Sequence, residues 1–303
     1  MNITATKTRK RTVYEELRPL LFSIAYRMLG SASEAEDIVQ EAFLRFHDES
    51  SKGADIESPK AWLSTVTTRL SINHLQSARV RRETYVGTWL PEPLLTDTDS
   101  EVARHAETAD SLSLAFLVLL ESLGPVERAV FLLHDVLDYG YDEIAAVVGK
   151  SEDNCRQIAL RARRQIEAKK PRFEASRQKR EELSRRFFDA VVAGDTDGLT
   201  ELLAADAVAY GDGGGKAPAF PLPIYGREKV VRLLMGVGRQ SARLAVSEIR
   251  PAEVNGQPGA LLLDSNGSPV GVVSLDIADG LVQTVRAVSN PAKLRHLVPR
   301  SPE

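Results

Sequence analysis

Five polar side chains within residues 152–169 are of the types that read and hold DNA. An arginine can form a bidentate pair with guanine, and asparagine or glutamine suits adenine. Arginines further along such a helix would bind phosphates, which gives affinity and register without reading sequence. An apolar stripe at helical spacing should face the core and turn these polar side chains outward. The outward residues are Asn154, Arg156, Gln157, Arg161 and Arg164, and the stripe is Cys155, Ile158, Ala159, Ala162 and Ile166.

The elements around this helix predict a helix-turn-helix. A short helix over 141–148, a turn at Gly149-Lys150-Ser151 and the long basic helix follow one another in the order typical of that motif. Two further helices, over 112–123 and from 126 to about 137, precede them and complete a module at 109–171. A plain helical hairpin with a solvated basic face is the alternative.

A second block of polar and basic residues begins at Pro59, which fits the first turn of a helix over 59–76. Bases exposed in a melted duplex can stack on an aromatic ring while arginines hold the backbone. Trp62 could instead anchor a core, and His74 is interpreted as a surface residue. The residues of this all-α module, 13–86, that we expect to contact nucleic acid are Trp62, Arg69, Asn73, Arg79, Arg81 and Arg82.

The distribution of charge along the chain supports two such surfaces. The formal net charge is −3, yet no acid occurs between Arg69 and Arg82, and the chain is strongly basic again over 156–186. The stretch 86–110 between these blocks has one base, Arg104, and is otherwise acidic. Two basic blocks around an acidic spacer predict two surfaces for a polyanion, although solvated helix faces would also produce such runs.

The second helix of the first module has a polar face that indicates a binding partner. A first helix over 17–29 should end at Gly30, and Ser31 or Ser33 can cap a second helix. One face of this second helix is apolar, whereas the other carries Glu36, Asp37, Gln40, Glu41, Leu44 and Arg45. We expect the residues before this module, 1–12, to form a loose basic tail. No apolar run approaches the roughly 20 residues that cross a bilayer, so we expect a cytoplasmic protein.

The segment 87–108 between the two helical modules is predicted to be a linker. Two prolines, Pro91 and Pro93, favour extended backbone, and the residues that follow are polar and acidic. Trp89 and three leucines are unusual in a free linker. They either cap a hydrophobic edge or dock on another domain.

The remainder of the chain, 173–299, predicts an α+β domain. Three helices, over 173–192, 196–204 and 226–238, surround a short strand at 207–210. Four strands of an antiparallel sheet follow near 243–250, 259–265, 269–278 and 281–289. Likely hairpin positions are marked by three dipeptides, Asn255-Gly256, Asn266-Gly267 and Asp279-Gly280.

The glycine-rich loop Gly213-Gly214-Gly215-Lys216 does not predict a nucleotide site. No Ser or Thr follows the lysine, and the next residues are proline-rich instead of helical. We interpret it as a flexible loop that contacts the linker or the first module, with Asp212 and Lys216 as charged anchors. Asp264 and Asp276 are the main acids within the strands, but neither can be paired with a histidine, and His296 follows the last strand. A pocket that senses a small molecule is therefore favoured over catalysis.

Metal and thiol chemistry find little support in the sequence. A single cysteine, Cys155, excludes an internal disulfide and a cysteine-rich zinc site. Because it belongs to the buried stripe, we interpret it as a core residue and not as a thiol sensor. We predict no catalytic residues, no metal and no cofactor.

Several motifs, taken in order, resemble the extracytoplasmic-function (ECF) sigma factors. The resemblance covers about residues 13–170 and implies core RNA polymerase and promoter DNA as partners. It implies that the helix bearing Asp37, Gln40, Glu41, Leu44 and Arg45 docks on the polymerase clamp coiled coil. Residues 62–82 would open and read the −10 element, and residues 152–166 would read the −35 element. The matching segments are 37–46 for regions 2.1–2.2, 59–63 with Arg69, Asn73 and Arg79 for regions 2.3–2.4, and 123–131, 141–145 and 161–164 for region 4.

Three further motifs resemble the SigJ-like subgroup, whose members carry a C-terminal SnoaL-like domain of the nuclear-transport-factor-2 type. Members usually have Asp where this chain has Ala292. The resemblance implies that the extension controls activity in cis. The motifs are Trp89-Leu90-Pro91-Glu92-Pro93, Asp212-Gly213-Gly214-Gly215-Lys216 and Asn290-Pro291-Ala292-Lys293-Leu294.

Two other functions remain as alternatives. A one-component regulator would join a ligand-binding domain to a helix-turn-helix without binding polymerase, but it leaves the polar face of residues 36–45 unexplained. A SnoaL-type enzyme with helical appendages lacks an acid/base set in the sequence.

Overall fold

The computed structural model describes residues 3–83, 85–96, 109–168, 176–239 and 245–298, without the side chains of 3–12, 78–83, 109–110 and 239. The described residues fall into two compact units. The first unit draws on 3–81 and 117–168, and the second on 82–83, 85–96, 109–116, 176–239 and 245–298. The linker residues 85–96 therefore belong to the same unit as the C-terminal domain.

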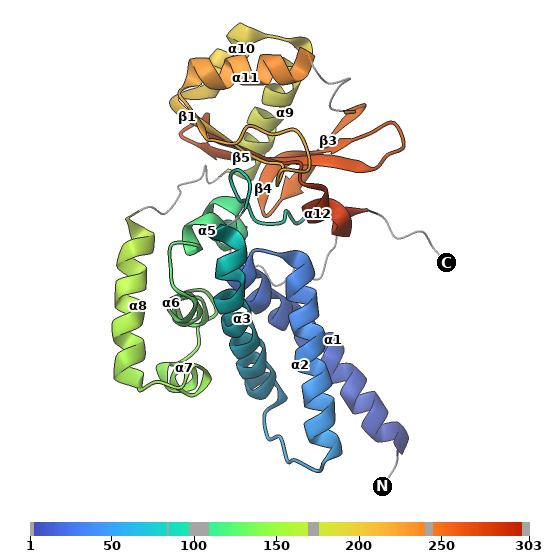
Figure 1. The fold of residues 1–303 in the computed structure, drawn as a ribbon, viewed down its shortest axis with the longest axis vertical. Coiled ribbons are helices and arrows are strands. Elements are labelled where there is room, and N and C mark those ends of the chain that lie inside the picture. Colours follow the sequence, from blue (N-terminus) through green and yellow to red (C-terminus); the bar gives the residue numbers. More distant parts are fainter. Residues whose placement is uncertain (1–2, 84, 97–108, 169–175, 240–244, 299–303) are drawn as a thin grey trace. The chain divides into compact units, whose positions relative to one another are not determined.

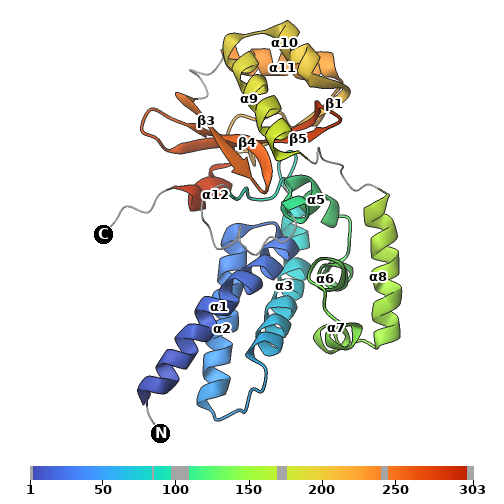
Figure 2. The same cartoon turned by 180° about the vertical axis from the view of Figure 1, so that it is seen from behind.

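The first unit is helical, and short polar residues and glycines set the ends of its helices. Gly30, with a φ of 67°, ends the first helix, and the Ser31 hydroxyl caps the second by accepting from the Glu34 N–H. Gly149 and Ser151 divide the helix-turn-helix in the same way, as the sequence predicts. The elements, shown in Figures 1 and 2, are α1 (Ile3–Leu29), α2 (Ala32–Ser51), α3 (Pro59–Glu83), α5 (Leu114–Leu120), α6 (Pro125–Phe131), a π-helical turn (Leu132–Val136), α7 (Tyr141–Val148) and α8 (Glu152–Glu167).

Some predicted boundaries in this unit are wrong. The expected loose tail is helical from Ile3 onward, and no glycine or proline interrupts residues 3–12. The third helix continues past its expected end at Gln76 to Glu83. The continuous helix expected from 126 to about 137 is α6 followed by the π-helical turn.

The C-terminal domain has three helices on one face of a six-stranded sheet, as both ribbon views show (Figures 1 and 2). The strand order is β2-β1-β6-β5-β4-β3. The core between the layers is built from alternate strand residues and helix residues such as Phe187, Leu199, Val230 and Leu275. The elements are α9 (Arg177–Ala193), α10 (Thr196–Leu202), β1 (Leu203–Asp212), β2 (Ile224–Tyr225), α11 (Arg227–Arg239), β3 (Glu248–Val254), β4 (Gln257–Leu263), β5 (Pro269–Ala278), β6 (Leu281–Val288) and α12 (Pro291–Leu294).

The sheet differs from the prediction in two respects. It is not wholly antiparallel, because β1 pairs with β6 in parallel. The strand expected near 243–250 runs over 248–254, and its first expected residues, 243–244, lie outside the described residues. Pro251 does not end this strand because β3 lies at the edge of the sheet, where a missing N–H is tolerated.

All three predicted hairpin positions are confirmed, and Asn266-Gly267 lies in the loop that joins β4 to β5. Asn255-Gly256 joins β3 to β4 and Asp279-Gly280 joins β5 to β6, and all four residues have positive φ. Positive φ at both central positions is the requirement of a type I′ turn, which these residue types favour. None of the described helices is both long and apolar enough to cross a membrane.

We expect Gly259→Ala to destabilise the C-terminal domain by about 1–3 kcal/mol, the usual cost of forcing extra atoms into a packed core. A Cβ at this position would lie 2.1 Å from the backbone carbonyl oxygen of Val273 on the neighbouring strand. Thermal unfolding followed by circular dichroism measures the effect. Gly236→Ala on α11 is the matched control, because a Cβ there meets nothing within 4 Å. Equal melting temperatures for the two variants would contradict the expectation.

Candidate DNA-reading surfaces and linker-docking site

Helix α8 presents the polar face that its spacing predicts. Its apolar stripe is buried against the other helices of the motif, and Asn154, Gln157, Arg161 and Arg164 are exposed. The Arg156 guanidinium is also exposed but is held by carboxylates of its own helix, 2.7 Å from Glu152 and 2.9 Å from Asp153. Burial raises the pKa of the Cys155 thiol, which keeps it protonated and unreactive.

Helix α2 turns its polar residues away from the core. Asp37, Gln40, Leu44 and Arg45 are exposed, while Ile38, Val39 and Ala42 are buried. Leu44 is 66% exposed, whereas the other apolar residues of α2 are buried or half-buried. Glu41 is half-buried and pairs with Arg45 at 2.8 Å. Leu44 thus lies on the exposed face of α2 among polar and charged residues.

On helix α3, only some of the residues expected to contact nucleic acid are exposed and available for that contact. Trp62 is half-buried against Phe46, with ring centroids 5.7 Å apart, so it anchors the packing of α3 on α2. Asn73 is exposed, and His74 is half-buried with its Nε2 3.1 Å from a Glu34 oxygen. The side chains of Arg79, Arg81 and Arg82 lie outside the described residues.

Arg69 is already occupied within the helical unit. Its Nε donates to the Val147 carbonyl at 2.9 Å, and its Nη2 donates to the Ala146 carbonyl at 2.8 Å. These carbonyls belong to the last turn of α7, where a cation is favoured by the helix dipole. The hydroxyls of Ser64 and Tyr139, 2.9 Å apart, form a second polar contact between α3 and the second helical module. The two helical modules thus contact each other through a predicted DNA-binding residue.

A buried carboxylate, Asp212 at the end of β1, holds the linker to the C-terminal domain. It is 1% exposed, and its Oδ2 accepts from the Leu90 N–H at 2.8 Å and from the Lys293 ammonium at 2.7 Å. Its Oδ1 accepts from the Tyr85 hydroxyl. Burial and this bond to Asp212 raise the pKa of Tyr85, so the hydroxyl keeps its proton and donates.

Lys293 on α12 is the second charged residue of this linker-binding site. Its ammonium also donates to the Leu90 carbonyl and lies over two aromatic rings of the linker, 4.3 Å from the Trp89 centroid and 4.9 Å from the Tyr85 centroid. A desolvated cation over a ring gains about 2 kcal/mol in favourable cases. The Asn290 side chain, which caps α12, donates to the Tyr85 hydroxyl at 2.8 Å. Asp212, Lys293 and Asn290 therefore form one polar site that binds linker backbone and side chains.

The glycine run allows the linker to approach this site closely. A Cβ on Gly214 would lie 2.2 Å from the Asn290 amide and 2.9 Å from the Tyr85 hydroxyl. A Cβ on Gly215 would press on Val86 at 3.2 Å, and both glycines have positive φ. The loop contacts the linker, as expected, but Lys216 is not the second charged anchor: its side chain is exposed and forms no bond among the described residues. Lys293 supplies the cation instead.

A second attachment joins the linker to the free edge of β3. Leu95 forms an antiparallel bridge with Val254, and backbone bonds run from Thr96 N–H to the Glu253 carbonyl and from Asn255 N–H to the Leu94 carbonyl. The buried Asn255 side chain accepts from the Leu94 N–H at 2.8 Å and donates to the Leu112 carbonyl at 2.9 Å. The linker thus extends the sheet by a short strand.

Sequence reasoning missed several residues of this docking site. Tyr85 and Thr96 belong to no motif of the sequence, and His296, whose Nε2 lies 2.7 Å from the Pro93 carbonyl, suggested at most a catalytic group. Asn255 was recognised as a turn residue, and no local pattern reveals that its amide also binds a distant strand. Leu90, Pro91, Glu92, Pro93 and Leu94 are all buried, so the linker docks on a domain instead of standing free.

The two acids that the sequence offered for catalysis, Asp264 and Asp276, are bonded to other groups in the described part of the chain. Asp276 is buried in an ion pair with Arg286, and Asp264 accepts from two N–H groups of its own hairpin. In the part of the chain that the structure describes, no group of three His, Cys, Asp or Glu residues is arranged to hold a metal ion.

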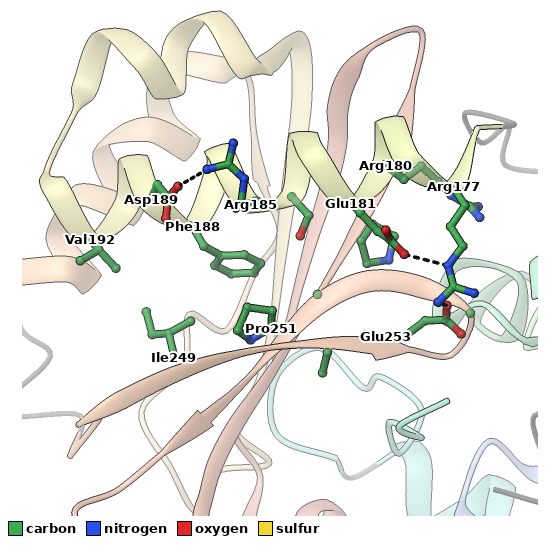
Figure 3. A pocket seen from close by; sticks show the side chains of 15 residues that line it. Arg177, Arg180, Glu181, Arg185, Phe188, Asp189, Val192, Ile249, Pro251 and Glu253 are labelled. Atoms are coloured by element: carbon green, nitrogen blue, oxygen red, sulfur yellow. Dashed lines mark hydrogen bonds and ion pairs between the residues drawn. The ribbon is translucent and has the colours of Figure 1, made fainter. Parts of the chain in front are cut away.

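A groove of about 450 Å³ lies between α9 and β3. Figure 3 shows its apolar floor, which includes Phe188 and Pro251. Two of its arginines are paired with acids of the same helix, Arg177 with Glu181 at 2.7 Å and Arg185 with Asp189 at 3.1 Å (Figure 3). A third arginine, Arg180, donates to the Gln257 side-chain oxygen at 3.4 Å. We assign no ligand to this groove.

Asp212→Asn is expected to destabilise linker docking by about 3–5 kcal/mol, because it leaves the Lys293 charge buried without its counter-ion. Trp89 fluorescence in a Trp62→Phe background, followed through urea unfolding, reports the loss. Lys216→Met, which removes an exposed cation without a described bond, is the control and should have no effect. Adding Lys293→Met to Asp212→Asn should recover part of the stability. Identical curves for Asp212→Asn and Lys216→Met would refute the assigned role of the pair.

Comparison with known proteins places both helical modules. Residues 13–81 match the family model of Sigma-70 region 2, and residues 113–166 match that of Sigma-70, region 4. The chain is similar to the ECF RNA polymerase sigma factor SigJ of Mycobacterium tuberculosis, with 37% identity over 92% of this chain and 91% of that protein. It is also similar to a probable ECF RNA polymerase sigma factor of the same organism, SigI, with 32% identity over 91% of this chain and 92% of that protein.

The resemblance extends to the C-terminal domain and to the fold. The crystal structure of M. tuberculosis SigJ matches 92% of this chain and 96% of its own, with a TM-score of 0.75 and 36% identity. The fold class expected from the sequence, two helical sigma modules followed by an α+β domain, is confirmed. The chain belongs to the family of ECF RNA polymerase sigma factors.

Proposed function

We propose that this chain binds core RNA polymerase in the cytoplasm and directs it to promoters through two DNA-reading surfaces, without covalent chemistry of its own. The exposed polar face of α8 carries the proposal, because its amide and guanidinium groups are displayed at a helix-turn-helix in a sigma-factor chain. Asn154, Arg156 and Gln157, near the start of α8, would contact bases of the −35 element. Arg161 and Arg164, further along, would bind phosphates.

The exposed face of α2 would dock on the clamp coiled coil of the polymerase. Asp37, Gln40, Glu41 and Arg45 would supply hydrogen bonds around Leu44, which is positioned to act as the apolar centre of the contact. The −10 element would be opened and held by α3, with Asn73 exposed for base contacts and the arginines up to Arg82 on the backbone.

Arg69 adds a step to this scheme. Its two bonds to the end of α7 occupy the Nε–Nη2 edge of the guanidinium, so a bidentate contact of this edge with the −10 element would require α3 and α7 to separate. These are exposed or half-buried bonds to neutral carbonyls, which contribute modestly to stability and can be replaced by bonds to phosphate.

The docked linker would control the two DNA readers in cis. Residues 85–96 connect α3 to the second helical module, and they are fixed by the Asp212 site and by the edge of β3. A linker that is already ordered loses less conformational entropy when both readers bind one promoter. The SnoaL-like domain would further sense a small molecule, and an apolar cavity of about 730 Å³ between α11 and the sheet supports this role.

Promoter-specific transcription with purified core polymerase tests the proposed function, and two variants separate its steps. Leu44→Ala should weaken core binding about tenfold or more, as expected for truncating a central interface residue. Arg161→Gln should leave core binding unchanged and lower the salt dependence of promoter binding by about 0.9 in slope. His47→Ala on α2 and Arg186→Gln on α9, both exposed, are the matched controls. A chain that supports no promoter-specific initiation on core polymerase would overturn the proposal.

Control in cis predicts that Asp212→Asn lowers promoter-specific transcription about fivefold at unchanged affinity for core polymerase. The released linker must be ordered again on the promoter, which costs conformational entropy. Transcription is measured beside Lys216→Met, whose side chain is exposed. Output equal to or above that of the unmodified chain would remove the proposed role of docking.

A further inference from the structure

The C-terminal domain contains an apolar cavity of about 730 Å³. It is walled by α11, by β4, β5 and β6, by the loop after the glycine run, and by α12. Its lining is almost entirely aliphatic or aromatic, with residues such as Phe220, Leu233 and Leu262. This size lies within the range of sites that enclose small molecules, and apolar linings of this kind bind apolar ligands.

Among the described residues that line this cavity, Arg232 is the only charged one. It is exposed, and it forms no ion pair within the described part of the chain. In the groove beside α9, by comparison, Arg177 and Arg185 are paired with carboxylates, and Arg180 donates to the Gln257 side-chain oxygen at 3.4 Å. A guanidinium without a carboxylate partner, next to an apolar chamber, suits a ligand with one carboxylate and an apolar body.

The cavity and the linker share two short segments of the domain. Gly211 lines the cavity, and the next residue of β1, Asp212, binds the linker. On α12, Pro291 and Leu294 line the cavity, while Lys293 binds Asp212 and Leu90. A molecule in the cavity therefore packs against the same segments that hold the linker.

We propose that this cavity binds an apolar carboxylic acid of the size of a medium-chain fatty acid, with its carboxylate on Arg232, and that this binding strengthens linker docking. The second part rests on the proposed role of docking in control of the sigma factor. A ligand in the cavity packs against α12 and the end of β1 and restricts their motion. These segments then lose less conformational entropy when the linker docks on them. By linkage, docking of the linker must strengthen binding of the acid by the same factor.

A displacement assay with the full chain tests whether the cavity binds an apolar carboxylic acid. The probe is a dansyl-labelled undecanoic acid, and unlabelled dodecanoate displaces it. We expect micromolar affinity for dodecanoate, about tenfold weaker binding to Arg232→Gln, and dodecanol affinity that is the same for both chains. Lys229→Gln, one turn earlier on α11 and outside this cavity, is the matched control. Gly236→Phe should abolish binding without unfolding, because Gly236 lines the cavity and a Cβ there points into open space.

Three results would overturn this part. They are the absence of probe binding at about 100 µM, unchanged binding by Gly236→Phe, and equal loss of dodecanoate and dodecanol binding in Arg232→Gln. This assay contains neither polymerase nor DNA, so its failure is distinguishable from failure of the sigma-factor function, which is measured in transcription without added acid.

Coupling to the linker is tested with the same probe. Asp212→Asn, which leaves every cavity residue in place, should weaken dodecanoate binding about fivefold, at the lower end of typical coupling between two sites. Dodecanoate should in turn stabilise the Trp89 signal of the unmodified chain against urea, and not that of Gly236→Phe. Equal affinity of Asp212→Asn and the unmodified chain for dodecanoate would show that the cavity and the linker site are independent.

Discussion

The buried pair of Asp212 and Lys293 determines how the second unit of this protein is built. Removing a carboxylate and an ammonium from water is costly, and their mutual attraction compensates only when the remaining hydrogen-bonding capacity is also satisfied. The linker supplies those remaining partners through the Tyr85 hydroxyl and through the backbone N–H and carbonyl of Leu90. The pair is therefore a binding site whose own polar groups are incompletely satisfied until the linker is present.

A single attachment would leave the linker free to rotate, and the edge of β3 removes that freedom. Asn255 binds Leu94 through both its backbone and its side chain, and the bridge between Leu95 and Val254 fixes the register of the added strand. Between the two attachments, Pro91 and Pro93 restrict the backbone to extended conformations. Docking consequently covers part of an exposed sheet edge, which would otherwise be open to pairing with other chains.

The contrast between local and distant patterns explains what could be predicted from the sequence. The inward stripe of α8, the caps at Ser31 and Ser151 and the turns at Asn255 and Asp279 depend on neighbouring residues, and each was predictable from spacing and residue type. The assignment of Lys216 as an anchor failed because charge alone does not show which of two lysines lies beside a carboxylate. Lys293 is far from Asp212 in sequence and meets it only because α12 follows β6, which pairs with β1. The pairing of Arg69 with α7 depends in the same way on tertiary structure.

Two classes of polar residue can now be separated by their partners. In the second unit, Asp212, Lys293 and Asn255 are buried and bonded within the chain, so their chemistry is used to hold the linker. In the helical unit, the polar groups of α8 and α2 stand exposed around buried stripes, where they contribute little to folding. Exposed polar side chains that contribute little to the stability of the fold remain available to bind other molecules. Arg69 belongs to neither class, since it is exposed and yet bonded within the chain to the Val147 and Ala146 carbonyls. The contact with promoter DNA that we propose for it would compete with these two bonds.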